Sequence, residues 1–218
     1  MDFIENYGRL LNDKKICLLN CTEDDEKAIA ELFSEQGGAV TAVNAKKDID
    51  AAKNADILVC GITDFGGGIF HKTDSEKMTE YIFENFAFVS EAIRAALPHM
   101  IESGGGAVVN IVSEYVDCCV PNVAAEAALS GMITAFSNAL AMDYAKFNIR
   151  FNRIQKRCVS GKNLQPVERD CTASDIANAA LFLASCMSDF TSGESLPVNG
   201  GGFCIGHNES WDGWLKRI

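Results

Sequence analysis

The sequence predicts an α/β protein built on a doubly wound parallel sheet. Short apolar runs alternate along the chain with longer segments of helical periodicity, which is typical of parallel strands joined by right-handed crossovers. Several of the apolar runs, such as DILVCG at 56–61, do not alternate apolar and polar residues. Such runs indicate strands that are covered on both faces. The 218 residues are expected to form one domain that spans 1–218.

About six strands and four helices are expected, in alternation. The strands are predicted at 16–20, 39–43, 56–61, 107–112, 149–154 and 195–200, and the helices near 24–36, 75–102, 122–146 and 174–187. Only about a dozen residues separate the second and third of these strands, too few for a helix–strand–helix excursion. One strand and its helix are therefore expected to be missing at that point. The segment 155–173 is also short and polar.

Composition argues against several classes of partner and site. The formal net charge of −11 makes nucleic acid and anionic membrane surfaces unexpected partners. No apolar run approaches membrane-spanning length, and MDFIENYGRL does not have the pattern of a secretion signal, so a soluble cytoplasmic protein is expected. The nine cysteines are scattered and include no CxxC pair, so we expect buried thiols and no metal site.

Five segments carry a resemblance to a known family. They are NFAFVSEAIRAALPHM (85–100), GGGAVVNIVS (104–113), LAMDYAKFNIRFN (140–152), SDIANAALFLAS (174–185) and TSGESLPVNGG (191–201). In order and spacing they resemble the short-chain dehydrogenase/reductase family, closely over 56–202 and loosely over the first 45 residues. The resemblance implies a Rossmann-like fold, truncated here by loss of the third-strand region, with a shortened cofactor-binding half and a shortened substrate loop. It also implies NAD(P)-dependent hydride transfer by an Asn, a Ser, a Tyr and a Lys.

Two of those four catalytic residues are replaced in this chain. Asn85 matches the family's Asn and Ser113 its Ser, but the Tyr and Lys positions fall on Glu126 and Ser130. A carboxylate of ordinary pKa is a poor acid for an alkoxide, and Ser130 has no charge with which to tune it. Asn85 and Ser113 are therefore expected to be vestigial, so that the chain has no catalytic residue and is not an enzyme by itself.

The family's glycine-rich turn after the first strand is replaced by NCTEDDEK at 20–27. A helix N-terminus attracts phosphate through free N–H groups and the helix dipole. Here Thr22 is expected to be the N-cap, with the acids of 23–26 filling the first turn. A pyrophosphate about 6 Å from one carboxylate would meet roughly 2–3 kcal/mol of repulsion per charge pair at an effective dielectric near 20. No cofactor-binding residue and no bound cofactor are expected.

The segments that keep the family pattern are those that form its subunit interfaces. The resemblance implies one interface through the helices near 75–102 and 122–146, and a second through the region 174–201. The helix over 127–145 is also more apolar than a surface helix needs. The tail 209–218 holds both tryptophans, and both docking on a neighbouring subunit and a mobile end stay open for it.

These observations favour a catalytically inactive subunit, or pseudoenzyme. It would stabilise an active NAD-dependent short-chain dehydrogenase subunit in a heterotetramer. Such an arrangement is similar to the dehydrogenase of anaerobic toluene degradation, which oxidises 2-(hydroxy(phenyl)methyl)succinyl-CoA. Two alternatives stay open: a small-molecule-binding homo-oligomer, and an enzyme of non-nicotinamide chemistry that uses Ser113 and Glu126.

Overall fold

The computed structural model describes residues 9–158 and 165–204, and the tryptophan-containing tail lies outside them. The main elements are β1 (Lys15–Leu19), α1 (Glu23–Glu35), β2 (Ala39–Val43), β3 (Ile57–Cys60), α2 (Ser75–Glu102), β4 (Gly106–Ser113), α3 (Ala124–Tyr144), β5 (Ile149–Lys156), α4 (Ala173–Ala184) and β6 (Ser195–Val198). Short 3-10 helices complete the described chain: η2 (Lys46–Asn54), η3 (Phe70–Lys72), η4 (Glu114–Val116), η5 (Ala145–Phe147), η6 (Cys186–Ser188) and η7 (Gly202–Cys204).

All strand pairs are parallel, and the six strands lie in the order β2-β1-β3-β4-β5-β6. Pairing in register is longest between β4 and β5, where residues 106–113 face residues 149–156. The chain moves outward from β1 to one edge and then returns to β3 on the other side of β1. The predicted doubly wound fold is therefore confirmed. In such sheets ligands bind beyond the carboxyl ends of the strands, at the point where the winding reverses.

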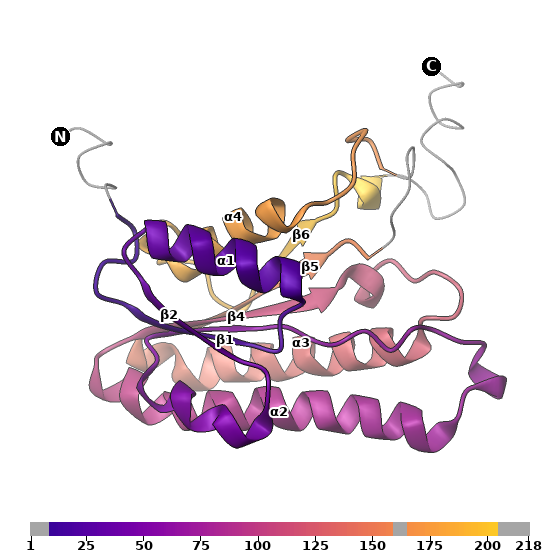
Figure 1. The fold of residues 1–218 in the computed structure, drawn as a ribbon, viewed down its shortest axis with the longest axis horizontal. Helices are drawn as coiled ribbons and strands as arrows, with labels where there is room; N and C mark the ends of the chain where they lie inside the picture. The colour runs from indigo at the N-terminus through magenta and orange to yellow at the C-terminus, as the bar shows by residue number, and fades with distance from the viewer. Residues whose placement is uncertain (1–8, 159–164, 205–218) are drawn as a thin grey trace.

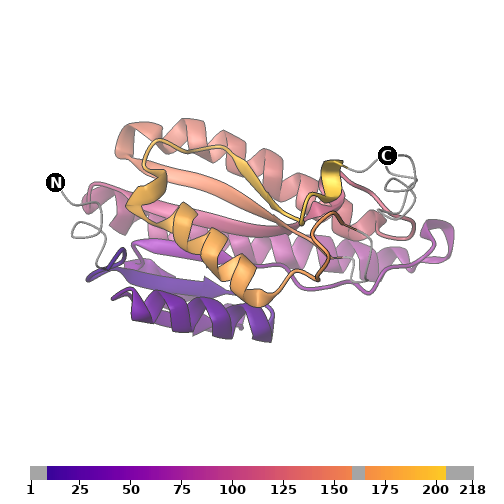
Figure 2. The same cartoon turned by 90° about the horizontal axis from the view of Figure 1, so that it is seen from above.

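Helices cover both faces of the sheet (Figure 1, Figure 2). The cluster on one face joins Leu58 and Val108 of the strands to α2 and α3, and the cluster on the other joins Val59 and Val109 to α1 and α4. Neighbouring residues of one strand thus enter opposite cores. That arrangement explains why the strands read as continuous apolar runs, because both of their faces are removed from water.

The region between β2 and β3 has the predicted shortening. Residues 46–54 form the single 3-10 helix η2, which packs against α2, and no further strand occurs there in the described chain. Among the described residues, no helix combines the length and the apolar character that crossing a membrane would require.

Candidate functional site

A pocket of about 500 Å³ opens at the carboxyl ends of the central strands. Its wall combines the turn after β1, the loop after β3, the ends of β4 and β5, and the first turn of α3. Five of its polar residues bear on the chemistry: Tyr81, Ser113, Tyr115, Glu126 and Lys156. The location is the one at which doubly wound sheets bind ligands. It is therefore the candidate site.

Glu126 brings a buried carboxylate to this pocket. The residue is 6% exposed, and its Oε1 accepts a hydrogen bond from the backbone N–H of Gly67 at 3.2 Å. Oε2 is also buried and has no hydrogen-bond partner in the described structure. Gly67 has a φ of +71°, in the left-handed region, and this conformation lets the loop turn its N–H toward the carboxylate. Buried polar atoms are rarely left without a partner.

Ser113 and Ser130 have different positions relative to the pocket. Ser113 ends β4, lines the pocket, and accepts a hydrogen bond at Oγ from the N–H of Tyr115 at 3.1 Å. Ser130 is fully buried, and its Oγ accepts from the N–H of Ser113 at 3.1 Å. Its hydroxyl therefore fastens α3 to the end of β4. Ser113 and Glu126 therefore line one cavity, whereas Ser130 is buried in the protein and does not line it.

Asn85 is held inside the fold, on α2. Its Oδ1 accepts from Asn20 Nδ2 at 3.0 Å and from the N–H and Oγ1 of Thr63 at 3.1 and 3.0 Å. Its Nδ2 donates to the carbonyl of Tyr81 at 2.8 Å. The amide thereby ties the turn after β1 and the loop after β3 to α2, and it is not part of the pocket wall.

Two tyrosines of the pocket lie outside the family's Tyr position. Tyr81 donates its hydroxyl to the carbonyl of Thr63 at 2.8 Å. Burial, followed by the charges of Glu126 and Asp64, raises the pKa of Tyr81 above the usual range of a phenol. Burial also raises the pKa of Tyr115 to about 12, with smaller contributions from neighbouring acidic groups that include Glu126. Both phenols therefore stay protonated at neutral pH. In the sequence, only their spacing from predicted site residues could have indicated these tyrosines. Tyr81 is one helical turn before Asn85, and Tyr115 follows Ser113 by two residues.

The turn after β1 is the corner where the family binds its dinucleotide. Asn20 occupies the left-handed region with a φ of +52°. A Cβ at Gly61 would lie 2.6 Å from the carbonyl oxygen of Asn20, so the turn packs directly onto the end of β3. Thr22 stands at the N-cap position as predicted, but its hydroxyl makes no capping bond. It donates to Asp25 Oδ2 at 2.8 Å instead, because that buried carboxylate needs donors more than the solvated N–H groups do.

Asp25 fills this corner from the first turn of α1. The residue is 3% exposed and forms an ion pair of 2.5 Å with Lys156 Nζ at the end of β5. Burial, followed by the charges of Asp25 and Glu26, raises the pKa of the nearby Cys21 thiol to about 12. The same negative field would oppose any incoming phosphate. The residues at this corner do not fit a dinucleotide pyrophosphate.

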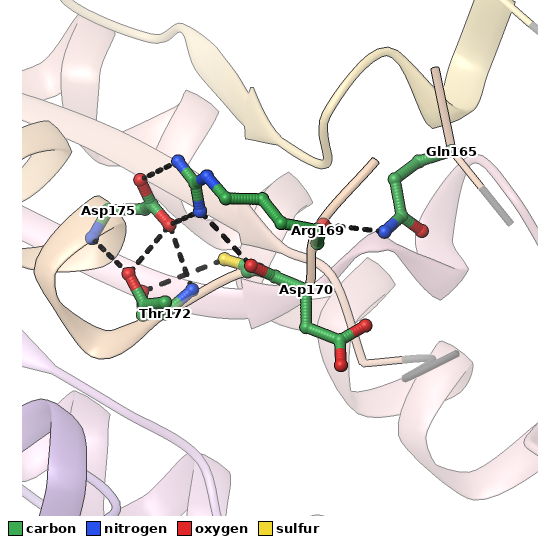
Figure 3. A network of polar contacts seen from close by, with 6 residues as sticks. Gln165, Arg169, Asp170, Thr172 and Asp175 are labelled. Atoms are coloured by element: carbon green, nitrogen blue, oxygen red, sulfur yellow. Dashed lines mark hydrogen bonds and ion pairs between the residues drawn. The ribbon is translucent and has the colours of Figure 1, made fainter. Parts of the chain in front are cut away.

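Residues 165–172, the described part of the loop before α4, carry a network of polar contacts that ends on Asp175 (Figure 3). Arg169 donates to both carboxylate oxygens of Asp175 at 2.6 and 2.7 Å. Asp175 also completes a capping box with Thr172, and Gln165 donates to the carbonyl of Arg169 at 2.7 Å. The hydrogen bonds from Arg169 are the largest cause of a pKa for Asp175 well below the usual range of a carboxyl. The part of the predicted short loop that falls at 159–164 is outside the described residues.

The thiols and acids of the described chain do not gather into a metal site. In residues 9–158 and 165–204, no three or more His, Cys, Asp or Glu side chains are grouped so that they could hold a metal ion. Eight cysteines of this part of the chain are free thiols: Cys17, Cys21, Cys60, Cys118, Cys119, Cys158, Cys171 and Cys186.

Comparison with known proteins places the chain among dehydrogenases. The short chain dehydrogenase family matches residues 40–172, more than half of the chain. A 2-(R)-hydroxypropyl-CoM dehydrogenase of Xanthobacter autotrophicus is 27% identical over 77% of this chain and 74% of its own length. A protein of the same organism named inactive 2-(S)-hydroxypropyl-CoM dehydrogenase 2 is 28% identical over 81% of this chain and 89% of its own.

Among solved structures, the fold is similar to a 3-ketoacyl-(acyl-carrier-protein) reductase from Brucella melitensis complexed with NADH. The TM-score is 0.82 at 20% identity, and the match covers 88% of this chain and 98% of the reductase.

The prediction that this chain is not an enzyme by itself is contradicted by these comparisons. The matching family and the first of these relatives are dehydrogenases by name, and the fold is that of a reductase. The prediction was wrong because it judged activity from residue types at two positions. The pocket still contains groups that exchange protons and donate hydrogen bonds, namely Ser113, Glu126 and two tyrosines.

Proposed function

Because this chain belongs to the short-chain dehydrogenase family, we propose that it works as one subunit of an oxidoreductase oligomer, together with a second chain of that family. The single observation that carries the proposal is the apolar outer side of α3. Its exposed positions include Ala128, Ala135, Ala139 and Met142, and Met142 is 81% exposed. Asp143 is the one exposed charged residue of this helix. Outer sides of this kind are typical of a helix that packs against another protein.

Helix α2 extends the same surface. The ring of Phe86 packs edge-on against Phe136 of α3 with centroids 5.1 Å apart. Phe83, one turn earlier on α2, is 62% exposed. Aromatic rings exposed beside an apolar helix face are frequent anchors of protein interfaces. We call Phe83, Ala128, Ala135, Ala139 and Met142 the α2/α3 surface.

A second apolar surface supports the same proposal at the other predicted interface. In the region 174–201, Met187 of η6 and Phe190 after it are exposed. Helix α4 carries Asp175 as its one charged residue. Two separate apolar surfaces suit an assembly of four chains better than a simple pair, because each surface pairs with a different neighbour.

The proposed partner is a chain that retains the family's motifs at the positions where this chain has other residues. It would have the family's Tyr and Lys where this chain has Glu126 and Ser130, and an open glycine turn where Asp25 pairs with Lys156. Two copies of each would form the predicted heterotetramer. Oxidation of a 2-(hydroxyaryl-methyl)succinyl-CoA by the partner stays a prediction, and so does a cytoplasmic location.

Co-expression tests the partnership. The tagged full-length chain would be produced with the short-chain dehydrogenase encoded nearest to it in its genome, and the purified sample measured by native mass spectrometry. The expected result is a complex with two copies of each chain. The same tagged chain expressed alone is the control. Recovery of homo-oligomers alone in both preparations would overturn the proposal in favour of a homo-oligomeric binding protein.

A second candidate function rests on the pocket itself. Ser113 and Glu126 line one cavity, so we propose as the alternative that this chain carries out its own proton-transfer chemistry there. Exchange of the α-hydrogens of a carbonyl compound with deuterium from the solvent, catalysed by the isolated chain, would support it, provided that Glu126→Gln abolishes this turnover. Turnover that survives Glu126→Gln would rule out this role.

A further inference from the structure

The positive charges around the pocket are paired with acids, whereas two of its negative charges are not paired with cations in the described structure. Among the described residues, Lys156 and Arg157 are the two cationic residues of its wall. Lys156 is paired with Asp25, and Arg157 donates to both oxygens of Glu114 at 3.1 and 3.2 Å. Both cations are therefore neutralised within the fold.

The remaining acids of the wall have no cationic partner in the described structure. Asp64 Oδ1 accepts from the N–H of Gly66 at 3.1 Å, and Glu126 Oε1 accepts from the N–H of Gly67. Each carboxylate is thus held by one glycine N–H of the same loop. Asp64 is exposed and solvated, whereas Glu126 is buried and its Oε2 lacks any partner there. A buried carboxylate in this state is costly unless a cation or a strong donor reaches it.

The two carboxylates act on the same part of the pocket. The charges of Glu126 and Asp64 contribute to the raised pKa of Tyr81 and to that of Tyr115. This region of the wall is therefore negative, and its aromatic rings stay uncharged. Rings and carboxylates in combination favour organic cations, through charge pairing and through the electron-rich ring faces.

From this arrangement we propose that the pocket binds a small organic molecule that carries an amine, with the ammonium group paired to Glu126. The apolar part of the ligand lies against the aromatic and aliphatic wall, which includes Ile62 and Ile111. This inference goes beyond the proposed subunit role and does not depend on it, because the pocket is built within one chain.

Three probes of similar size and different charge test the proposal on the full-length wild-type chain. Benzylamine, benzyl alcohol and benzoate would each be titrated by calorimetry at pH 7. Benzylamine is expected to bind about tenfold more tightly than benzyl alcohol, as an added charge-assisted hydrogen bond provides. Benzoate is expected to bind most weakly of the three, because its carboxylate faces two others.

Glu126→Gln identifies the group responsible. The variant keeps the shape of the side chain and removes its charge, so benzylamine should lose about tenfold in affinity and bind like the alcohol. Glu102→Gln is the matched control, since it makes the same change of charge at an exposed site at the far end of α2. It should leave all three affinities unchanged.

Several results would overturn the proposal. They are equal affinity for the three probes, preference for benzoate, absence of benzylamine binding at millimolar concentration, or unchanged benzylamine binding in Glu126→Gln. The wild-type series decides the charge preference even if the variant folds poorly. A failed co-expression experiment would leave these affinities unaffected, so the two proposals can fail separately.

Discussion

Helices α1 and α3 cover opposite faces of one sheet and bury similar inner sides, but their outer sides differ. Ile29 and Phe33 of α1 and Leu129 and Ile133 of α3 are all essentially inaccessible to solvent. On the outside, α1 exposes charged residues at 23, 24, 27, 31 and 35. The outer side of α3 exposes four alanines, Asn138 and Met142 instead, with Asp143 as its one exposed charge. The inner sides of both helices are apolar because they pack into the core. The outer side of α1 is charged because it faces water, whereas that of α3, by our proposal, packs against another chain.

The largest expected effect separates a fold residue from a surface residue of the same type. Phe33→Ala should lower the free energy of unfolding by about 3–5 kcal/mol, because the ring is fully buried and a cavity remains. Phe83→Ala should change the same quantity by less than about 0.5 kcal/mol in the dilute isolated chain. Urea unfolding followed by circular dichroism measures both. Equal losses would mean that Phe83 belongs to the core and not to the α2/α3 surface.

A smaller effect is expected when one negative charge is placed on each helix. Met142→Glu should weaken association by about 2–3 kcal/mol, or roughly 30- to 150-fold, since a charge would be buried against the partner. Ser34→Glu, at an exposed position of α1, should leave association unchanged. Analytical ultracentrifugation of the co-expressed complex measures the dissociation constant. If both variants weaken it alike, net charge rather than the α3 face governs assembly.

The smallest expected effect concerns pH. Helix α4 shares the face of α1, and Asp175 at its start has a lowered pKa in the folded chain. Its contribution is therefore fully present above the unfolded carboxyl pKa of about 3.9 and is lost as the pH falls below that value. Asp175→Asn should cost about 1 kcal/mol at pH 7, as loss of a helix cap does, and clearly less near pH 2, below the unfolded pKa. Thermal melts of both proteins at the two pH values measure this.

The α2/α3 surface should not share that pH dependence between pH 4 and 7, because alanine, methionine and phenylalanine do not titrate. The dissociation constant of the complex, measured at pH 4 and at pH 7, is the control. A stability difference for Asp175→Asn that is as large at pH 2 as at pH 7 would show that the carboxylate charge is not its source.

The sequence predicted the fold well because fold signals are local. The strand predicted at 107–112 is found at 106–113, and the helix predicted near 75–102 is found at those bounds. The helix predicted near 174–187 ends earlier, at Ala184, because Ser185 turns to an extended conformation before η6 begins.

The candidate site was predicted less completely, because its contacts join distant parts of the chain. Ser113 and Glu126 were identified by counting along a family pattern, and both line the pocket. The pair of Asp25 and Lys156 joins residues 131 positions apart, and no periodicity predicts it. The two tyrosines were missed as pocket residues for the same reason. They reach the pocket from different elements, and only the packing of α2 against the end of the sheet brings them together.

The ion pair between Asp25 and Lys156 makes single substitutions at this corner costly. Replacing Lys156 leaves the carboxylate of Asp25, which is 3% exposed, without its cation. Replacing Asp25 leaves the ammonium group of Lys156, whose side chain is 27% exposed, without its anion. Either first step loses stability before a second can regain it. The close approach of Asn20 to Gly61 also leaves no room for a side chain at position 61 unless the turn moves. Opening this corner to a pyrophosphate would therefore require several simultaneous changes.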